Sequence, residues 1–215
     1  MNIEKEIRNV KEDARGYFEG VFGSHDWDHV ERVYKLALHI GEKEGADLEV
    51  LKLAAYLHDI GRPEQAKTKG KVCHAEHGAK LAKEILARNG FDQAMIDRVS
   101  KCIEAHRLSV RREHKSLESK VLFDADTIDS LGAIGLGRLF SFAGSIGAKV
   151  HNKDVDVTVN HEYTTEDTPY WYFMNRGKDA PKRMFTKEGR RIAQARYEFM
   201  GKFFKRINAE VDGAK

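Results

Sequence analysis

The segment Leu51-Lys-Leu-Ala-Ala-Tyr-Leu-His58-Asp59-Ile-Gly61-Arg-Pro63 carries a polar pair at the end of an apolar helix. Its apolar residues recur at three- and four-residue steps, which predicts a buried helix face that includes His58. Gly61 and Pro63 end this helix just after the pair. A buried carboxylate needs an ionic partner or a cation, and the neighbouring imidazole can share that cation. Taken alone, the dipeptide favours a capping or surface role.

The composition favours a soluble protein with a core of its own. A chain of 215 residues is long enough to form one domain, and its 37 basic and 34 acidic residues are scattered and nearly balanced. This balance permits anionic ligands such as nucleotides but does not favour long nucleic acids. Cys73 and Cys102 lack CxxC spacing, and neither a secretion signal nor a run of ~18 apolar residues occurs. We therefore expect a cytoplasmic protein with reduced thiols and no membrane contact.

Apolar periodicity predicts helices along most of the chain. Its three prolines, at positions 63, 169 and 181, lie outside the periodic segments, which favours an all-α fold. N-caps are expected at Ser24 or Asp26, at Asp47 and at Asp92. The expected helices cover about residues 2–21, 26–45, 47–58, 73–89, 92–106 and 186–209.

One domain is expected over residues 1–215, with its core at about 20–147. Residues 150–185 break the helical pattern and predict an irregular excursion, with a short strand or an extended loop, that packs over the core and can serve as a lid. The last helix is expected to bury eight apolar residues: Ile192, Ala193, Ala195, Phe199, Met200, Phe203, Phe204 and Ile207.

A cationic loop is expected between Arg62 and Val72, just after the His-Asp pair. It carries Arg62, Lys67, Lys69 and Lys71. The pattern fits either a solvated turn or a mobile lip that attracts phosphate, and by itself it favours the turn.

Further histidines lie on both sides of the pair. His25 and His29 are four residues apart and face the same way if both are helical. His29 lies on the same helix face as apolar Val33, so a functional role is favoured for His29. For His25, a surface or capping role is about as well supported as a functional one. His77 and His106 end apolar stripes, where a histidine is more often a core residue than a ligand.

Three carboxylates, Asp124, Asp126 and Asp129, are embedded among apolar residues of the segment 120–138. Burying them without a cation is costly. Asp126 and Asp129 share a helix face, whereas Asp124 points elsewhere. The glycines that follow match neither GxxxxGK[ST] nor GxGxxG, so no phosphate-binding loop is predicted.

His29, the His58-Asp59 pair and Asp126 supply two imidazoles and two carboxylates from three predicted helices. Two nitrogen and two oxygen donors suit a divalent ion that keeps positions for water and substrate, and the lack of thiolates argues against a structural zinc site. In these residues the chain resembles the HD-domain superfamily of metal-dependent phosphohydrolases, whose pattern is a His, a His-Asp pair and a distant Asp. The resemblance extends over segments 24–33, 55–61, 123–135 and 183–190, as in a bacterial and archaeal subgroup of predicted HD hydrolases.

The resemblance implies an HD-type helical bundle and a metal site. The ligands that match the family pattern are His29, His58, Asp59 and Asp126, the last because Thr-Ile-Asp follows it. The implied cofactor is one divalent ion: manganese, cobalt, nickel, iron, magnesium or zinc. A second metal, or a supporting shell, would use His77 and His106, with His74 as the less favoured alternative.

The resemblance also implies hydrolysis of a small phosphorylated substrate, most simply a nucleotide, by a monomer or homodimer. Residues that can orient the attacking water are Asp59, Asp124 and Glu76. Leaving-group protonation falls to His25 or His77. Cations that can neutralise the phosphate are Arg32, Arg62 and Lys67.

Two other functions stay open. One is a nucleotide-sensing binding protein with an HD fold and little turnover. The other is a di-iron oxygenase, which would require both His77 and His106 as ligands.

Overall fold

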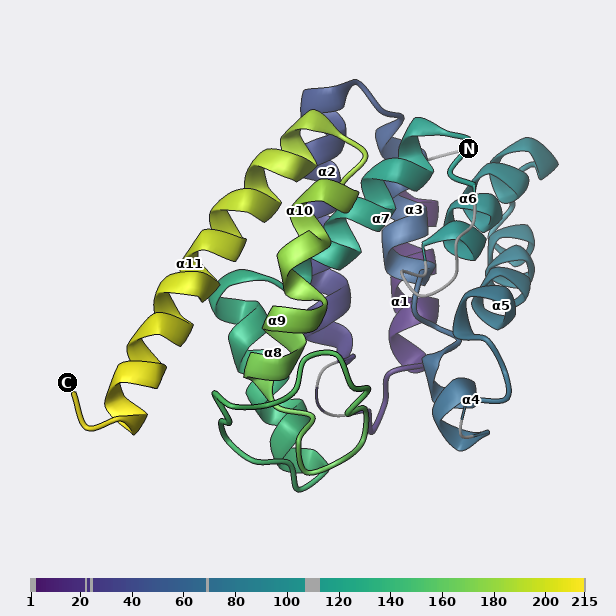
Figure 1. Ribbon diagram of the computed structural model, residues 1–215. Helices are drawn as coiled ribbons and strands as arrows, with labels where there is room; N and C mark the ends of the chain where they lie inside the picture. Colours follow the sequence, from purple (N-terminus) through teal and green to yellow (C-terminus); the bar gives the residue numbers. More distant parts are fainter. Residues whose placement is uncertain (1–2, 22, 24, 69, 107–112, 215) are drawn as a thin grey trace. The chain divides into compact units, whose positions relative to one another are not determined.

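The computed structural model describes residues 3–21, 23, 25–68, 70–106 and 113–214, and within them every regular element is a helix (Figure 1). The predicted all-α class is therefore confirmed. The chain divides into two compact units, Met1–Asp126 and Thr127–Lys215. The expectation of a single domain over the whole chain stays a prediction.

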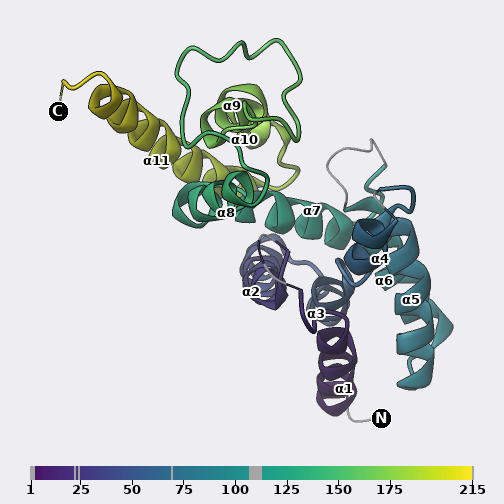
Figure 2. The same cartoon turned by 90° about the horizontal axis from the view of Figure 1, so that it is seen from below.

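The first unit is built around α3 (Leu48–Leu57). Figure 2 shows α3 between α2 and the pair α5 and α6, and it contacts α1 as well. Seven of its ten residues are buried, because a helix that is apolar on all sides must be covered on all sides. The other helices of this unit are α1 (Ile3–Gly16), α2 (Trp27–Glu44), α4 (Arg62–Lys67), α5 (His74–Arg88), α6 (Gln93–Ala105) and the first three turns of α7 (Leu117–Asp129).

The predicted helix caps are present where the chain is described. The Asp26, Asp47 and Asp92 carboxylates accept hydrogen bonds from the first-turn amides of α2, α3 and α6. Ser24, the alternative cap of α2, lies outside the described residues. Gly45 and Gly90 follow α2 and α5 with φ of +76° and +81°, a backbone conformation that glycine adopts without strain.

Two expected boundaries were wrong. The first helix ends at Gly16 instead of about residue 21, because the next amides, of Tyr17 and Phe18, bond to carbonyls three residues back and form turns. Residues 62–67 form the short helix α4 where a loop was expected. Pro63 lies in the first turn of α4, where its missing N–H costs nothing.

The second unit contains the end of α7, then α8 (Gly132–Ser145), α9 (Pro169–Asn175), η1 (Gly177–Asp179), α10 (Ala180–Arg183) and α11 (Lys187–Val211). Within it, α11 packs on α8 and α10. The irregular excursion expected at 150–185 is confirmed for residues 150–168, but its second half is helical. No strand forms at 151–161, because the Asn152, Asp156 and Asn160 side chains bond to amides two residues ahead and hold turns.

The α11 helix begins after its N-cap Thr186, close to the predicted start. Ala193, Met200 and Phe204 are buried, but Ala195 and Phe199 are exposed. The predicted apolar stripe was thus wider than the face of α11 that is buried. Over the part of the chain that the structure covers, no helix is both long and apolar enough to cross a membrane.

Candidate metal centre

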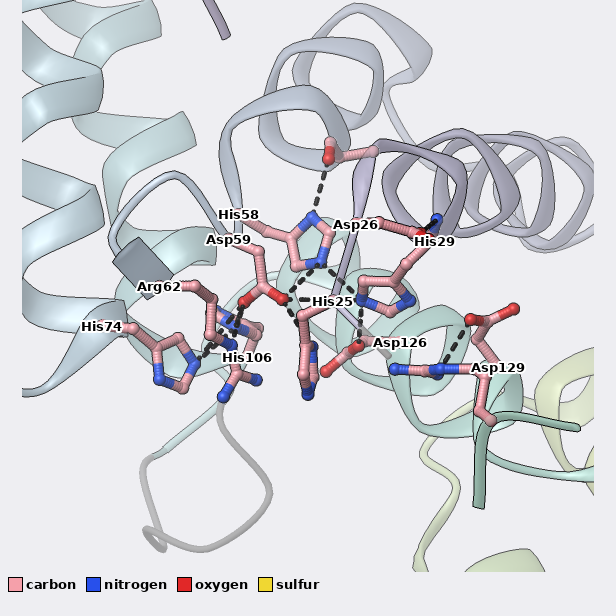
Figure 3. Close-up of polar contacts among 12 residues, drawn as sticks. His25, Asp26, His29, His58, Asp59, Arg62, His74, His106, Asp126 and Asp129 are labelled. Carbon is pink, nitrogen blue, oxygen red and sulfur yellow. Dashed lines mark hydrogen bonds and ion pairs between the residues drawn. The ribbon is translucent and has the colours of Figure 1, made fainter. Parts of the chain in front are cut away.

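Asp59 lies at the centre of a histidine cluster in the first unit (Figure 3). Its side chain is fully buried. Its Oδ2 atom lies 3.1 Å from His25 Nδ1, 3.5 Å from His29 Nε2 and 3.7 Å from His58 Nε2. Asp126 approaches the same group from α7, with Oδ1 3.3 Å from His29 Nε2. Three imidazoles and the Asp126 carboxylate therefore lie on the Oδ2 side of Asp59.

The other oxygen of Asp59 faces a second pair of histidines. Oδ1 lies 3.6 Å from His74 Nε2 and 3.5 Å from His106 Nε2. It also accepts a 2.9 Å hydrogen bond from Arg62 Nε. The candidate metal-holding groups among the described residues are thus His25, His29 and Asp59; His29, His58 and Asp126; and Asp59, His74 and His106.

Stacked aromatic rings join the helix ends that carry His29 and His58. The ring of Trp27, at the start of α2, is stacked 6.0 Å from that of Tyr56, near the end of α3. His29 follows Trp27 by two residues on α2, and His58 follows Tyr56 by two residues, directly after the last residue of α3. The stack thus joins α2 to α3 two residues before each histidine.

A backbone carbonyl determines which nitrogen of His58 carries the proton. His58 Nδ1 donates to the Ala55 carbonyl at 2.7 Å. Because a carbonyl only accepts, Nδ1 holds the proton, and Nε2 of the neutral ring is an acceptor. This Nε2 lies 3.3 Å from His29 Nε2, close to the Asp59 carboxylate. A divalent cation would satisfy all these acceptors together, whereas a proton on His29 serves them in part.

The pair formed by His74 and His106 shows the same arrangement more clearly. His106 Nδ1 donates to the Ile103 carbonyl at 2.6 Å, and His74 Nδ1 donates to the side-chain oxygen of Gln65. The two Nε2 atoms are therefore both acceptors, and they lie only 3.2 Å apart. Two lone pairs at this distance repel each other unless a cation lies between them. The donors present fit a divalent ion.

The electrostatics of the cluster keep the Asp59 and Asp126 carboxylates charged and the His58 and His74 imidazoles neutral. Burial alone would raise the pKa of Asp59, but Arg62 and the surrounding imidazoles hold it well below the ordinary value. Burial would likewise raise the pKa of Asp126, but the hydrogen bond from His29 and the nearby imidazoles together lower it. Burial lowers the pKa of His58 to about 4 and that of His74 to about 2. Near neutral pH these four side chains thus have the protonation state that metal binding requires.

These pKa shifts predict that the metal-free protein loses stability in mild acid. The ordinary histidine pKa is 6.5, and that of His58 in the folded state is about 4. Between these values the unfolded chain binds more protons, so the free energy of unfolding falls as the pH falls. Urea unfolding with a chelator should give a lower midpoint at about pH 5 than at about pH 7. His74→Gln should reduce the difference and the exposed His39→Gln should not, whereas a stability that rises in acid contradicts the prediction.

The structure brings together some of the residues predicted from sequence. His25, His29, His58, Asp59, Asp126, Arg62 and His106 all lie in the cluster. Five other candidates lie outside the three groups. Asp124 is buried, Glu76 and Lys67 are exposed, and Arg32 and His77 are partly exposed.

The structure brings His74, the less favoured alternative, into a candidate group that does not include His77. His74 and Gly78 are four residues apart on α5 and share the face that packs against Gly61. His77, which is partly exposed, belongs to none of the candidate groups among the described residues. Sequence analysis also missed Gln65, which holds the His74 ring, because the segment 62–72 was expected to be a loop.

Gly61 lets α5 approach the His-Asp turn. A Cβ atom at position 61 would lie 2.2 Å from the His74 carbonyl oxygen and 2.8 Å from the Gly78 amide nitrogen. Gly61→Ala should therefore displace α5 and cost about 1–3 kcal/mol of stability. Gly16→Ala is the matched control, because a Cβ there meets nothing within 4 Å. Denaturant unfolding checks both variants, and equal stability of the two would contradict the packing argument.

Comparison with known proteins places the chain in a family. A model of the HD domain matches residues 26–131. The Bacillus subtilis protein YpgQ, which is described as uncharacterized, is 31% identical over 213 residues, covering 99% of this chain and 97% of YpgQ. The chain belongs to the HD domain family. The matched HD region includes every member of the three candidate groups except His25.

Solved structures agree with the HD assignment over the whole chain. The structure of B. subtilis YpgQ in complex with ADP has a TM-score of 0.76 at 28% identity and covers 98% of this chain and 97% of that one. A predicted HD superfamily hydrolase from an uncultured Thermotogales bacterium has a TM-score of 0.68 at 30% identity, with 98% and 99% covered. This HD protein thus has a hydrolase-like fold with candidate metal-binding clusters.

Proposed function

We propose that this HD protein is a divalent-metal-dependent phosphohydrolase that acts on a nucleotide. The observation that carries the proposal is the convergence of imidazole and carboxylate acceptors on Asp59, with few protons to share among them. The complex of YpgQ with ADP supports a nucleotide as the ligand class.

The proposed ligands of the main ion are His29, His58, Asp59 and Asp126, as the family pattern implies. A second, weaker position would be formed by Asp59 Oδ1 with His74 and His106, which lie within reach of one another. When bound, a divalent cation lowers the pKa of a coordinated water and polarises a phosphoryl oxygen.

The remaining polar groups have roles that follow from their contacts. Arg62 uses Nε to hold Asp59, so its other N–H donors can bind phosphate oxygens. His25 is 36% exposed and donates to Asp59 through Nδ1, which leaves Nε2 as an acceptor. Burial, followed by repulsion from Arg62, lowers the pKa of His25 to about 4. A neutral His25 suits proton acceptance better than leaving-group protonation, so we propose that it orients the attacking water.

The second histidine pair is also compatible with one other function. Two histidine groups on opposite oxygens of Asp59 are also the arrangement that a di-iron oxygenase would need. His74 would then take the place expected for His77. Bound iron together with oxygen consumption would favour this function over hydrolysis.

The test is metal analysis of the purified protein, followed by phosphate and pyrophosphate release from a panel of nucleotides and phosphomonoesters. Manganese, cobalt, nickel or magnesium is added in turn. We expect metal-dependent release that His29→Ala abolishes. His39→Ala, on the same helix but exposed, is the matched control. Full metal content and full activity in His29→Ala would refute the ligand assignment, and bound metal without turnover would favour a nucleotide sensor.

A further inference from the structure

Arg62 and the second histidine pair share one oxygen atom. Asp59 Oδ1 accepts the Arg62 Nε hydrogen bond at 2.9 Å, and the His74 and His106 Nε2 atoms lie 3.6 Å and 3.5 Å from the same oxygen. The point at which a cation would satisfy both imidazole lone pairs is therefore next to a guanidinium that is already bound. The other oxygen, Oδ2, has only histidines and no guanidinium among its described neighbours.

Two positive groups at one carboxylate oxygen repel each other, and the repulsion is poorly screened because Asp59, His74 and His106 are buried. Arg62 is the more easily displaced of the groups around Oδ1. Its side chain is 25% exposed, and it stands at the first position of the short helix α4. An oxyanion can attract its free N–H donors.

We propose that Arg62 and a second divalent cation compete for Asp59 Oδ1, and that an oxyanion which draws Arg62 away opens this position. The proposal rests on the function proposed above. It makes occupancy of the second position depend on a bound phosphate group, whereas the main position, on the Oδ2 side, fills independently of Arg62.

The experiment titrates the metal-free, full-length protein with Mn²⁺ and follows the free ion by electron paramagnetic resonance. The wild type should bind one equivalent tightly and a second at least about tenfold more weakly. In Arg62→Met the second equivalent should bind at least about tenfold more tightly, with a spin-coupled signal. Arg62→Lys keeps the charge and should resemble the wild type. Lys67→Met, on the same helix but exposed, controls for loss of one positive charge.

An excess of sulfate, an oxyanion that holds Mn²⁺ weakly, tests the second half of the proposal. It should tighten the second equivalent in the wild type and have little effect in Arg62→Met. Equal second-site affinity in the wild type and Arg62→Met, or one equivalent in every variant, would overturn the competition and leave the phosphohydrolase proposal intact. Failure of the wild type to bind any Mn²⁺ would instead refute the metal centre itself.

Discussion

Asp126→Asn should remove the bound metal and lower phosphate release by about 10³-fold or more, which corresponds to about 4 kcal/mol of transition-state stabilisation. The carboxylate lies 3.3 Å from His29 Nε2 and is 16% exposed, so it borders the centre without being enclosed by it. An amide keeps the shape but lacks the charge that a divalent ion requires. Metal analysis and steady-state phosphate release measure the two effects.

Asp124→Asn is the matched control for this prediction. Asp124 lies two residues earlier on α7 and is fully buried, but it belongs to none of the candidate groups found in the described ranges. We expect it to retain the metal. If Asp124→Asn loses the metal and Asp126→Asn keeps it, the last ligand has been assigned to the wrong aspartate.

Asp129→Ala should cost about 3–5 kcal/mol of stability and leave metal content unchanged. Asp129 is fully buried, and it accepts a 2.8 Å charged hydrogen bond from Arg138, which is 13% exposed. Removing the carboxylate leaves a guanidinium in a desolvated position without this counter-charge, which costs more than the pair contributes. Urea unfolding gives the loss of stability.

A double variant separates the pair from the charge left behind. Asp129→Leu with Arg138→Met removes both charges and should be more stable than Asp129→Ala, because no uncompensated ion stays buried. A double variant that is less stable than Asp129→Ala would show that the two side chains have structural roles beyond their pairing.

Residues with a strong local signal were predicted well. The caps Asp26, Asp47 and Asp92 act through amides two or three residues away, so sequence spacing alone identifies them. His58-Asp59 and Asp126 were selected by the HD family pattern, and the structure brings them together. Metal binding by these residues stays a prediction.

What sequence could not supply was the packing between segments. The choice of His74 over His77 depends on which face of α5 meets Gly61, a contact between backbones that no side-chain pattern reveals. Gln65 became visible only when residues 62–67 proved to be helical. Pro63 was interpreted as the end of one helix, although it also lies in the first turn of the next.

His58 and His106 share a feature that bears on metal selection. Each follows the last residue of its helix and donates Nδ1–H to a carbonyl three residues back, one that the helix end leaves without an intrahelical partner. Folding alone therefore orients both rings before any ion arrives. One ion can then replace another without local unfolding, and intrinsic affinity follows the Irving–Williams series. We expect the resident metal to be the one that the cell's free-metal pool supplies.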